Sequence, residues 1–275
     1  MLKTPNNCTV GILGCGWLGQ ALAKKLVSKS YKVRGTTTQN ENLKTLEKIG
    51  IDSFKIEIYS DHVKGNLKSF LKNLDVLIIA IPPKLRQTKD SLKKGLEYIF
   101  KTNEFSTLKN LIHISSTGVF ADGKNKFYNE NSMPNNKSSR GEYLKNLEAL
   151  VLEQKQIQNI NILRLGGLVE YGGRHPIHYL SGKTEVSNPK APINLIEKED
   201  AVNIIVKIIE NKPTVQKYFH GVYPKHTERE TYYTDKATEL KIKPPSFEKP
   251  SLNEGKIIKS EITQNLLEFK YSNQP

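Results

Sequence analysis

A glycine-rich turn near the start of the chain has the spacing of a phosphate-binding loop. The stretch GCGWLG places glycines at Gly14, Gly16 and Gly19. It follows an apolar run, TVGILG, that predicts a buried strand, and it precedes LGQALAKKLVSK, whose leucines recur at helical spacing. The first glycine allows a tight turn, the second lets a pyrophosphate approach the backbone, and the third lets helix and strand pack closely. The pattern predicts a dinucleotide site, and a packing turn without a ligand is the competing interpretation.

The end of the second predicted strand indicates which dinucleotide binds. An NAD site needs a carboxylate about 20 residues after the first glycine, to accept a hydrogen bond from the ribose 2′-hydroxyl. Arg34 occupies that place, and Thr36, Thr37 and Thr38 end the strand. Hydroxyl and guanidinium groups suit a 2′-phosphate, so we predict NADP as the preferred cofactor and NAD as the alternative. A competing interpretation is that the threonines are only β-formers at a strand end.

Strand and helix patterns alternate along the first 165 residues. Short apolar runs predict strands at 9–14, 31–37, 51–59, 74–83, 110–118 and 160–167, with amphipathic helices between them. This alternation implies right-handed crossovers and a parallel sheet covered on both faces. We therefore predict an α/β fold with a doubly wound parallel sheet (Rossmann) and a smaller C-terminal substrate lobe. The expected boundaries are 1–167 for the NAD(P)-binding domain and 168–275 for the lobe, with 194–222 returning to the sheet.

The pattern weakens after residue 167. Residues 199–210 predict a helix, 217–224 a strand, 256–259 a short strand and 261–268 a short helix. The polar segment 122–139 is predicted to be a long loop, which is typical of lids and of disordered segments.

Several motifs occur in the order typical of the extended short-chain dehydrogenase/reductase family of epimerases and dehydratases. The matching stretches are GCGWLG, HISSTGVF, NENSMP, ILRLGGLVEYG and INLIEKEDAV. With GGRHPI, SGKT and GKII added, the chain resembles the atypical YeeZ-like branch over essentially its whole length. The resemblance implies an NAD(P)-dependent oxidoreductase or epimerase that acts on a small polar substrate, with an anionic one as an option. It also implies that Ser116 positions the substrate carbonyl or hydroxyl, with Thr117 beside it.

The helix after the fifth predicted strand departs from the family pattern. Gly141 and Glu148 fix a register that puts Arg140 at the place of the catalytic tyrosine and Leu144 at that of its lysine partner. A guanidinium keeps its proton near neutral pH, so Arg140 cannot act as a general base. It can bind a carboxylate or phosphate, or stabilise negative charge that develops on an oxygen. Tyr143, one turn further, is expected to point at a different angle.

Two alternatives remain open for this departure. The first alternative is that Arg140 is a surface arginine that takes no part in any chemistry. In the second, the whole protein is a non-catalytic sensor or regulator that binds NADP(H).

The C-terminal lobe contributes the predicted substrate ligands. Arg174 and His175 follow two glycines, Lys183 lies in the same excursion, and Asn194 precedes a predicted helix. An ordinary surface loop is the alternative for the first two. Histidines, cysteines and carboxylates show no metal-ligand spacing, so we predict no metal. The remaining residues predicted to lie against the cofactor are Trp17, Leu18, Ile81, Pro82 and Ser115.

Composition excludes several classes of protein. The net charge is +14 over 275 residues, but the excess is dispersed lysine rather than a basic block, so we expect no nucleic-acid partner. Two cysteines give no disulfide framework, and the first ten residues lack an apolar run, so we expect no signal peptide. Apolar runs fall short of the roughly 18 residues of a membrane span, so we expect a soluble, cytoplasmic protein. The resemblance also implies an optional homodimer through helices at 88–101 and 140–158.

Overall fold

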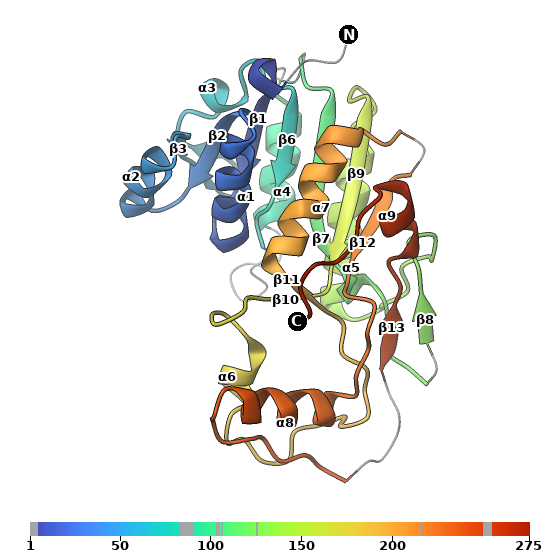
Figure 1. The fold of residues 1–275 in the computed structure, drawn as a ribbon. Helices are drawn as coiled ribbons and strands as arrows, with labels where there is room; N and C mark the ends of the chain where they lie inside the picture. The colour runs from blue at the N-terminus through green and yellow to red at the C-terminus, as the bar shows by residue number, and fades with distance from the viewer. Residues whose placement is uncertain are drawn as a thin grey trace. The chain divides into compact units, whose positions relative to one another are not determined.

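A computed structural model describes residues 5–82, 91–102, 105, 107–124, 126–214, 216–249 and 255–275 (Figure 1). Among these residues, seven strands form a central sheet in the order β12-β9-β7-β6-β1-β2-β3. In that order they are Tyr218–Gly221, Asn159–Leu165, Asn110–Ser116, Val76–Ile79, Thr9–Leu13, Lys32–Thr37 and Asp52–Lys55. The neighbouring pairs from β3 to β7 are all parallel. The predicted α/β fold with a Rossmann-type parallel sheet is therefore confirmed.

Strand β1 lies inside this sheet, between β2 and β6 (Figure 1). Gly11 pairs with Arg34 on one side and with Leu77 on the other. All four residues of β6 are buried, and so are four of the five residues of β1. Strands covered on both faces appear in the sequence as continuous apolar runs, which is why VLII and VGIL were recognisable.

Helices alternate with these strands along the chain. Helix α1 buries Gly19, Leu22, Ala23 and Leu26, at the spacing of three and four residues that places side chains on one helical face. The short helix α3 is capped by Asn66, whose side chain accepts a hydrogen bond from the backbone of Ser69 at 3.1 Å. The helices that alternate with the sheet strands are α1 Trp17–Ser28, α2 Asn40–Lys48, α3 Leu67–Leu71, α4 Ser91–Phe100, α5 Ser139–Leu152 and α7 Lys198–Asn211.

The chain divides into two compact units. The first contains Met1–Ser115, Tyr143–Leu163 and Ile205–Lys217, and the second contains Ser116–Glu142, Arg164–Ile204 and Tyr218–Pro275. The further elements of the second unit are β8 Lys126–Tyr128, β10 Gly167–Val169, α6 Pro176–Leu180, β11 Leu195–Glu197, α8 Arg229–Glu239, β13 Lys256–Ile258 and α9 Glu261–Leu266. Strand β10 pairs with β11, and β13 pairs with β8.

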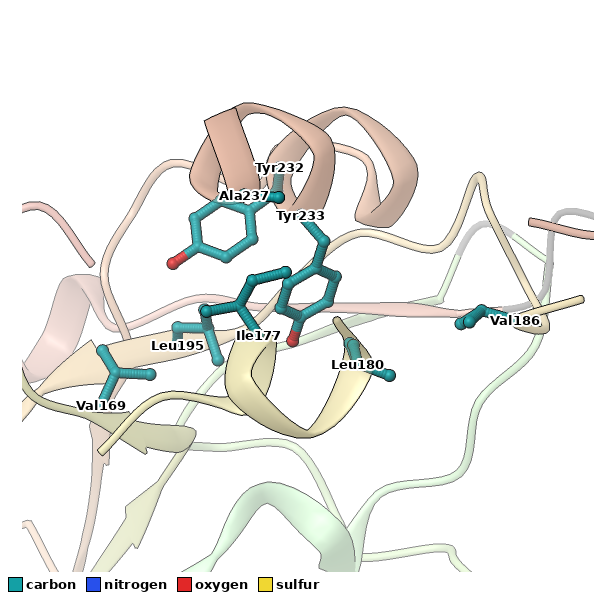
Figure 2. Packing of buried hydrophobic residues seen from close by; sticks show 8 residues of the cluster. All are labelled: Val169, Ile177, Leu180, Val186, Leu195, Tyr232, Tyr233 and Ala237. Carbon is teal, nitrogen blue, oxygen red and sulfur yellow. The ribbon is translucent and has the colours of Figure 1, made fainter. Parts of the chain in front are cut away.

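A hydrophobic core in the second unit joins α6 and α8. Figure 2 shows Ile177 of α6 beside Tyr233 of α8, within a cluster that also includes Leu180 and Ala237. The rings of Tyr232 and Tyr233 meet edge to face, with centroids 5.1 Å apart. This packing holds α6, and with it the loop that contains the predicted substrate ligands Arg174 and His175.

Two predicted elements differ from the structure. The strand expected at 51–59 is split into β3 and β4 Glu57–Ile58, and β4 pairs antiparallel with β5 Val63–Lys64. The segment expected to be a loop, 122–139, contains β8. Helix α8 was not predicted. The end of the strand expected at 74–83 and the start of the helix expected at 88–101 lie outside the described residues.

Candidate functional site

The turn after β1 requires its glycines for different reasons. Gly14 has a φ of 105°, a conformation that other residues rarely adopt, and a Cβ there would lie 3.1 Å from the backbone of Ala80. A Cβ on Gly19 would lie 2.5 Å from the carbonyl oxygen of Gly14, so α1 approaches the turn this closely only with glycine. At Gly16, the N-cap residue of α1, an added Cβ would meet no atom within 4 Å. The backbone there faces open space.

The end of β2 supports this turn. The Oγ1 of Thr36 accepts a hydrogen bond from the Gly14 backbone at 2.9 Å, and the Thr36 carbonyl accepts one from Cys15 at 2.8 Å. Thr37 accepts a hydrogen bond from the backbone of Gln39 at 3.2 Å. Thr36 and Thr37 are buried, and Thr38 is exposed. Both hydroxyl groups act as acceptors in these bonds, which do not use their protons.

A cavity of about 400 Å³ lies in the first unit, beside the turn and the end of β2. Its size falls within the usual range of small-molecule sites, roughly 300–1,000 Å³. Gly14, Gly16, the three threonines and Ile81 with Pro82, all predicted to bind the cofactor, line it together. Trp17, Leu18, Gly19, Arg34 and Ser115, also predicted, are not among its described lining residues. The cavity is also lined by residues that no sequence motif indicated: Cys15, Gln39, Asn42, Ile56, Ile58, Leu92 and Tyr143.

The described residues that line this cavity carry no formal charge. Thr38, Gln39 and Asn42 supply neutral hydrogen-bonding groups where β2 passes into α2. A carboxylate at this place would accept from a ribose 2′-hydroxyl and repel a 2′-phosphate. Gln39 and Asn42 had a signal in the sequence, because they lie within five residues of the strand end that we predict to select the nucleotide.

Arg34 is turned toward another part of the first unit. Its guanidinium donates to the carbonyl oxygens of Ser69 and Phe70, each at 3.2 Å, and to that of Lys72. These carbonyls belong to the last turn of α3 and its end, where a cation is favoured. The structure therefore places the Arg34 charge on α3 and not on the cavity. The threonines, by contrast, remain on the cavity wall.

Cys15, in the glycine turn, is not a reactive thiol. Its side chain is 2% exposed, and burial raises the pKa of the thiol to about 12. The thiolate is the nucleophilic form of cysteine, so this side chain stays protonated and unreactive near neutral pH. It packs against Gly35 of β2, where an added Cβ would lie 2.5 Å from the sulfur.

Ser115 links the end of β7 to α5. Its hydroxyl donates to the Glu148 carboxylate across 2.6 Å, and both side chains are buried. Hydrogen bonds to a carboxylate are among the stronger ones in proteins. Ser115 thus anchors the helix, and its hydroxyl is already used within the protein.

Ser116, Thr117 and Arg140 all lie in the second unit, where a hydrogen-bond network joins the segments that contain them. Ser116 Oγ accepts from the Gly118 backbone at 3.1 Å, and the Gly118 carbonyl accepts from the Asn136 side chain at 2.8 Å. Asn136 Oδ1 in turn accepts from the backbone of Ser138 at 2.9 Å.

The same network continues into the first turn of α5. Ser138 Oγ accepts from the Gly141 backbone at 3.1 Å, which caps the helix. A Cβ on Gly141 would lie 2.5 Å from the Asn136 side chain, so glycine is needed here. Arg140, next to Gly141, is exposed, and the described residues offer it no ion pair. One chain of hydrogen bonds therefore joins the backbone segments that contain Ser116 and Arg140.

Of the α5 positions Arg140, Tyr143 and Leu144, only Tyr143 is among the described residues that line the cavity. Leu144 is 2% exposed and packs in the core. Tyr143, expected to point elsewhere, is a lining residue of the cavity. Helical spacing was a usable signal for Tyr143, because a residue next to the buried positions 144 and 147 lies at the edge of the inner face.

His175 is fixed by two hydrogen bonds in the second unit. Its Nδ1 accepts from the Ile177 backbone at 3.0 Å, which caps α6. The Nε2 therefore carries the proton and donates to the Tyr232 hydroxyl at 2.8 Å. Burial, with a smaller contribution from the charge of Lys236, lowers the pKa of His175 to about 4. A neutral histidine with both nitrogens engaged holds α6 against α8.

The other predicted substrate ligands have varied surroundings. Arg174 is exposed. The ammonium group of Lys183 lies 3.1 Å from the centre of the Tyr179 ring, as a cation–π contact. The side-chain amide of Asn194 donates to the Lys256 carbonyl at 2.8 Å and accepts from the Ile258 backbone at 2.9 Å. Asn194 thus holds β13 in place.

The part of the chain that the structure describes shows neither a metal-ligand cluster nor a membrane-spanning helix. It contains no group of three or more histidine, cysteine and carboxylate side chains placed to hold a metal ion. None of its helices is long and apolar enough to cross a membrane.

Comparison with solved structures gives the class of fold. UDP-glucuronic acid 4-epimerase from Bacillus cereus, solved in complex with NAD, superposes with a TM-score of 0.78 at 16% identity, over 97% of this chain and 92% of that one. A short-chain dehydrogenase/reductase superfamily protein from Agrobacterium tumefaciens, solved with bound NAD, gives 0.75 at 14% identity, over 97% and 93%. The chain therefore has the fold of NAD(P)-binding epimerases and short-chain dehydrogenases.

Sequence comparison points to a particular relative. The chain is 29% identical to protein YeeZ of Escherichia coli K12 over 266 residues, which is 95% of each protein. Residues 9–96 also match the family described as NADP oxidoreductase, coenzyme F420-dependent. These matches confirm the resemblance to the YeeZ-like branch that the motifs predicted.

Proposed function

We propose that this protein is an NADP-dependent oxidoreductase or epimerase-like enzyme that acts on a small polar, anionic substrate. The observation that carries the proposal is the cavity of the first unit. It combines the open glycine turn at Gly14 and Gly16 with a strand end rich in hydroxyl groups. The relatives solved with NAD and the match to an NADP oxidoreductase family support a nicotinamide dinucleotide as its ligand.

The preference for NADP rests on the polar rim of the cavity. Thr38, Gln39 and Asn42 offer hydroxyl and amide donors, and no described lining residue is a carboxylate. The backbone amides in the first turn of α2 add further positive potential near Gln39 and Asn42. Arg34 takes no part in this proposal, since its charge lies on the carbonyls of α3.

A fluorescence titration with NADPH and NADH at one salt concentration tests the cofactor. Trp17, the single tryptophan, begins α1 beside the glycine turn and reports binding. We expect NADPH to bind more than about tenfold tighter, which corresponds to 1.4 kcal/mol. Thr38→Asp should remove this preference, because the new carboxylate repels a 2′-phosphate and accepts from a 2′-hydroxyl. If neither nucleotide binds, the turn is only a packing turn and the proposal fails.

The chemistry on the substrate side is assigned to Ser116, Thr117 and Arg140. A bound NADPH would supply hydride to a carbonyl carbon. Ser116 would hold the carbonyl oxygen, and Arg140 would stabilise its negative charge or bind an anionic group of the substrate. Arg140 cannot supply the proton at neutral pH, so water or a substrate hydroxyl must do so.

A sensor that binds NADP(H) without turnover is the second candidate, favoured by the buried Leu144 and by Arg140. A screen of small carbonyl acids with NADPH, followed by cofactor absorbance, separates the two. An Arg140→Ala variant that binds NADPH normally but loses turnover supports the enzyme hypothesis. An Arg140→Lys variant, which keeps the positive charge, should then recover part of the rate. Absence of turnover with every carbonyl acid in the wild-type protein favours the sensor.

A further inference from the structure

Tyr143 stands out among the residues on the cavity wall. It is the one aromatic side chain among the described lining residues, and its phenol adds a hydroxyl group to a wall that also contains Ile81 and Leu92. The mechanism outlined above makes no use of it. Tyrosine presents both a flat apolar face and a hydrogen-bonding group, which suits contact with a nucleoside.

The position of Tyr143 is fixed by the packing of α5 within the first unit. Leu147 and Val151 follow it at intervals of four residues, and both are almost completely buried. The hydrogen bond of 2.6 Å from Ser115 to Glu148 attaches this helix to the end of β7. Tyr143 lies five residues before Glu148, about 7.5 Å along the helix axis. The phenol ring therefore lies on a rigid, anchored helix.

The strand order indicates which part of a dinucleotide Tyr143 would meet. The order reverses between β1 and β6, with β2 and β3 on one side and β6 and β7 on the other. Each half of such a sheet binds one mononucleotide, and the pyrophosphate lies at the glycine turn between them. Thr36, Thr37 and Thr38 end β2 and face the adenosine half. Tyr143, on the helix attached to β7, belongs to the other half.

We propose that Tyr143 contacts the nicotinamide half of the bound dinucleotide and holds it against the cavity wall. This inference rests on the proposed function, because it requires that a dinucleotide binds in the cavity. The neighbouring position cannot do this, since Leu144 is buried in the core. Tyr143 thus sets the affinity for the whole dinucleotide without affecting that for its adenosine fragment.

The test compares two ligands in three variants. NADPH contains both halves, whereas adenosine 2′,5′-bisphosphate contains only the half assigned to the threonines. We expect Tyr143→Leu to weaken NADPH binding about tenfold or more, and Tyr143→Phe to weaken it about two- to tenfold, the range for loss of one hydrogen bond. Neither substitution should change the dissociation constant of the bisphosphate. Tyr98→Leu is the matched control, because Tyr98 lies exposed on α4 outside the cavity lining.

Each outcome decides the inference. Equal weakening of both ligands, or unchanged binding of NADPH in both Tyr143 variants, overturns it while the proposed function stands. Failure of the wild-type protein to bind NADPH overturns the proposed function itself. If Tyr143→Leu does not fold, as judged by its melting temperature against Tyr98→Leu, the Tyr143→Phe variant decides alone. Selective weakening of NADPH by that variant then supports the inference, and unchanged binding overturns it.

Discussion

Two glycines of the turn after β1 should separate folding from ligand binding. Gly14→Ala forces a side chain into the left-handed region, 3.1 Å from the Ala80 backbone, so we expect a loss of about 1–3 kcal/mol in the free energy of unfolding. Gly16→Ala meets no atom within 4 Å, but alanine is a poorer N-cap than glycine, so the free energy of unfolding should fall by no more than about 1 kcal/mol. Urea unfolding of the two variants measures both effects.

The Gly16→Ala variant also tests whether the pyrophosphate of the dinucleotide lies against the glycine turn. Gly16 lines the cavity, and a methyl group there occupies the space through which a pyrophosphate approaches the backbone. Gly16→Ala should therefore weaken NADPH binding by about 1.4 kcal/mol or more, a tenfold effect, in a protein that remains folded. A Gly16→Ala variant that binds NADPH like wild type would show that the phosphates lie elsewhere.

At the scale of elements, the bond between Ser115 and Glu148 should contribute measurably to the docking of α5 on β7. Both side chains are buried, and the bond involves a carboxylate. Ser115→Ala should lower the free energy of unfolding by about 1.5–3 kcal/mol, the range for hydrogen bonds to charged groups. Ser28→Ala removes an exposed hydroxyl bonded to Lys25 and serves as the control.

The unfolding free energies of Ser115→Ala and Ser28→Ala could also contradict this prediction. Equal, small effects on urea unfolding would mean that α5 is held by its leucines alone. Loss of the bond should also weaken NADPH binding, because Tyr143 lies on the same helix. A Ser115→Ala protein with reduced stability and normal NADPH affinity would show that the helix stays docked without the bond.

Elements with strong apolar periodicity were predictable from sequence, and others depended on tertiary contacts. Strand β6 and helix α1 have the patterns that their burial requires. Helix α8, RETYYTDKATE, buries only Tyr232, Tyr233 and Ala237, which do not form a recognisable apolar stripe. The strand expected at 51–59 is divided because its pairing partner changes after Ile56. The backbone N–H of Ile56 still bonds to Thr37 of β2, whereas Glu57–Ile58 pairs with β5.

The candidate site shows the same division. The glycine turn and the threonines end two consecutive strands of one strand–helix–strand unit, so their pattern predicted a shared dinucleotide site. Arg34 is bound by carbonyls 35 to 38 residues further along the chain, which spacing cannot reveal. Tyr143 faces the cavity because the leucines and Glu148 fix the rotation of α5, and that rotation is set by packing.

At the scale of the whole molecule, buried neutral histidines should make the protein sensitive to acid. His113 lies in β7 with both ring nitrogens buried and unbonded among the described residues, and burial lowers its pKa to about 4. His220 donates from Nδ1 to the Lys259 carbonyl, and burial, with a smaller contribution from the charge of Arg164, lowers its pKa to about 3. Burial raises the pKa of Glu130, which has the opposite effect on acid stability.

The sign of the effect follows from these pKa values. An unfolded histidine binds a proton below about pH 6.5, whereas His113 in the folded protein stays neutral down to about pH 4. The unfolded state therefore binds more protons, and the free energy of unfolding falls as the pH falls through this window. Between pH 7 and pH 5, His113 alone should account for a loss of about 2 kcal/mol. Glu130 offsets part of this loss in the free energy of unfolding, but only as the pH approaches the raised pKa of Glu130.

Substitution of His113 isolates its share from those of His220 and Glu130. His113→Leu removes the titrating group and two unbonded polar atoms from a buried site, so it should match or exceed the stability of wild type at pH 7. Its stability should also fall less between pH 7 and pH 5, by about 2 kcal/mol. Urea unfolding at the two pH values measures this difference. Parallel pH dependence in the two proteins would mean that His113 is solvated or bonded in solution, and that acid sensitivity arises from other groups.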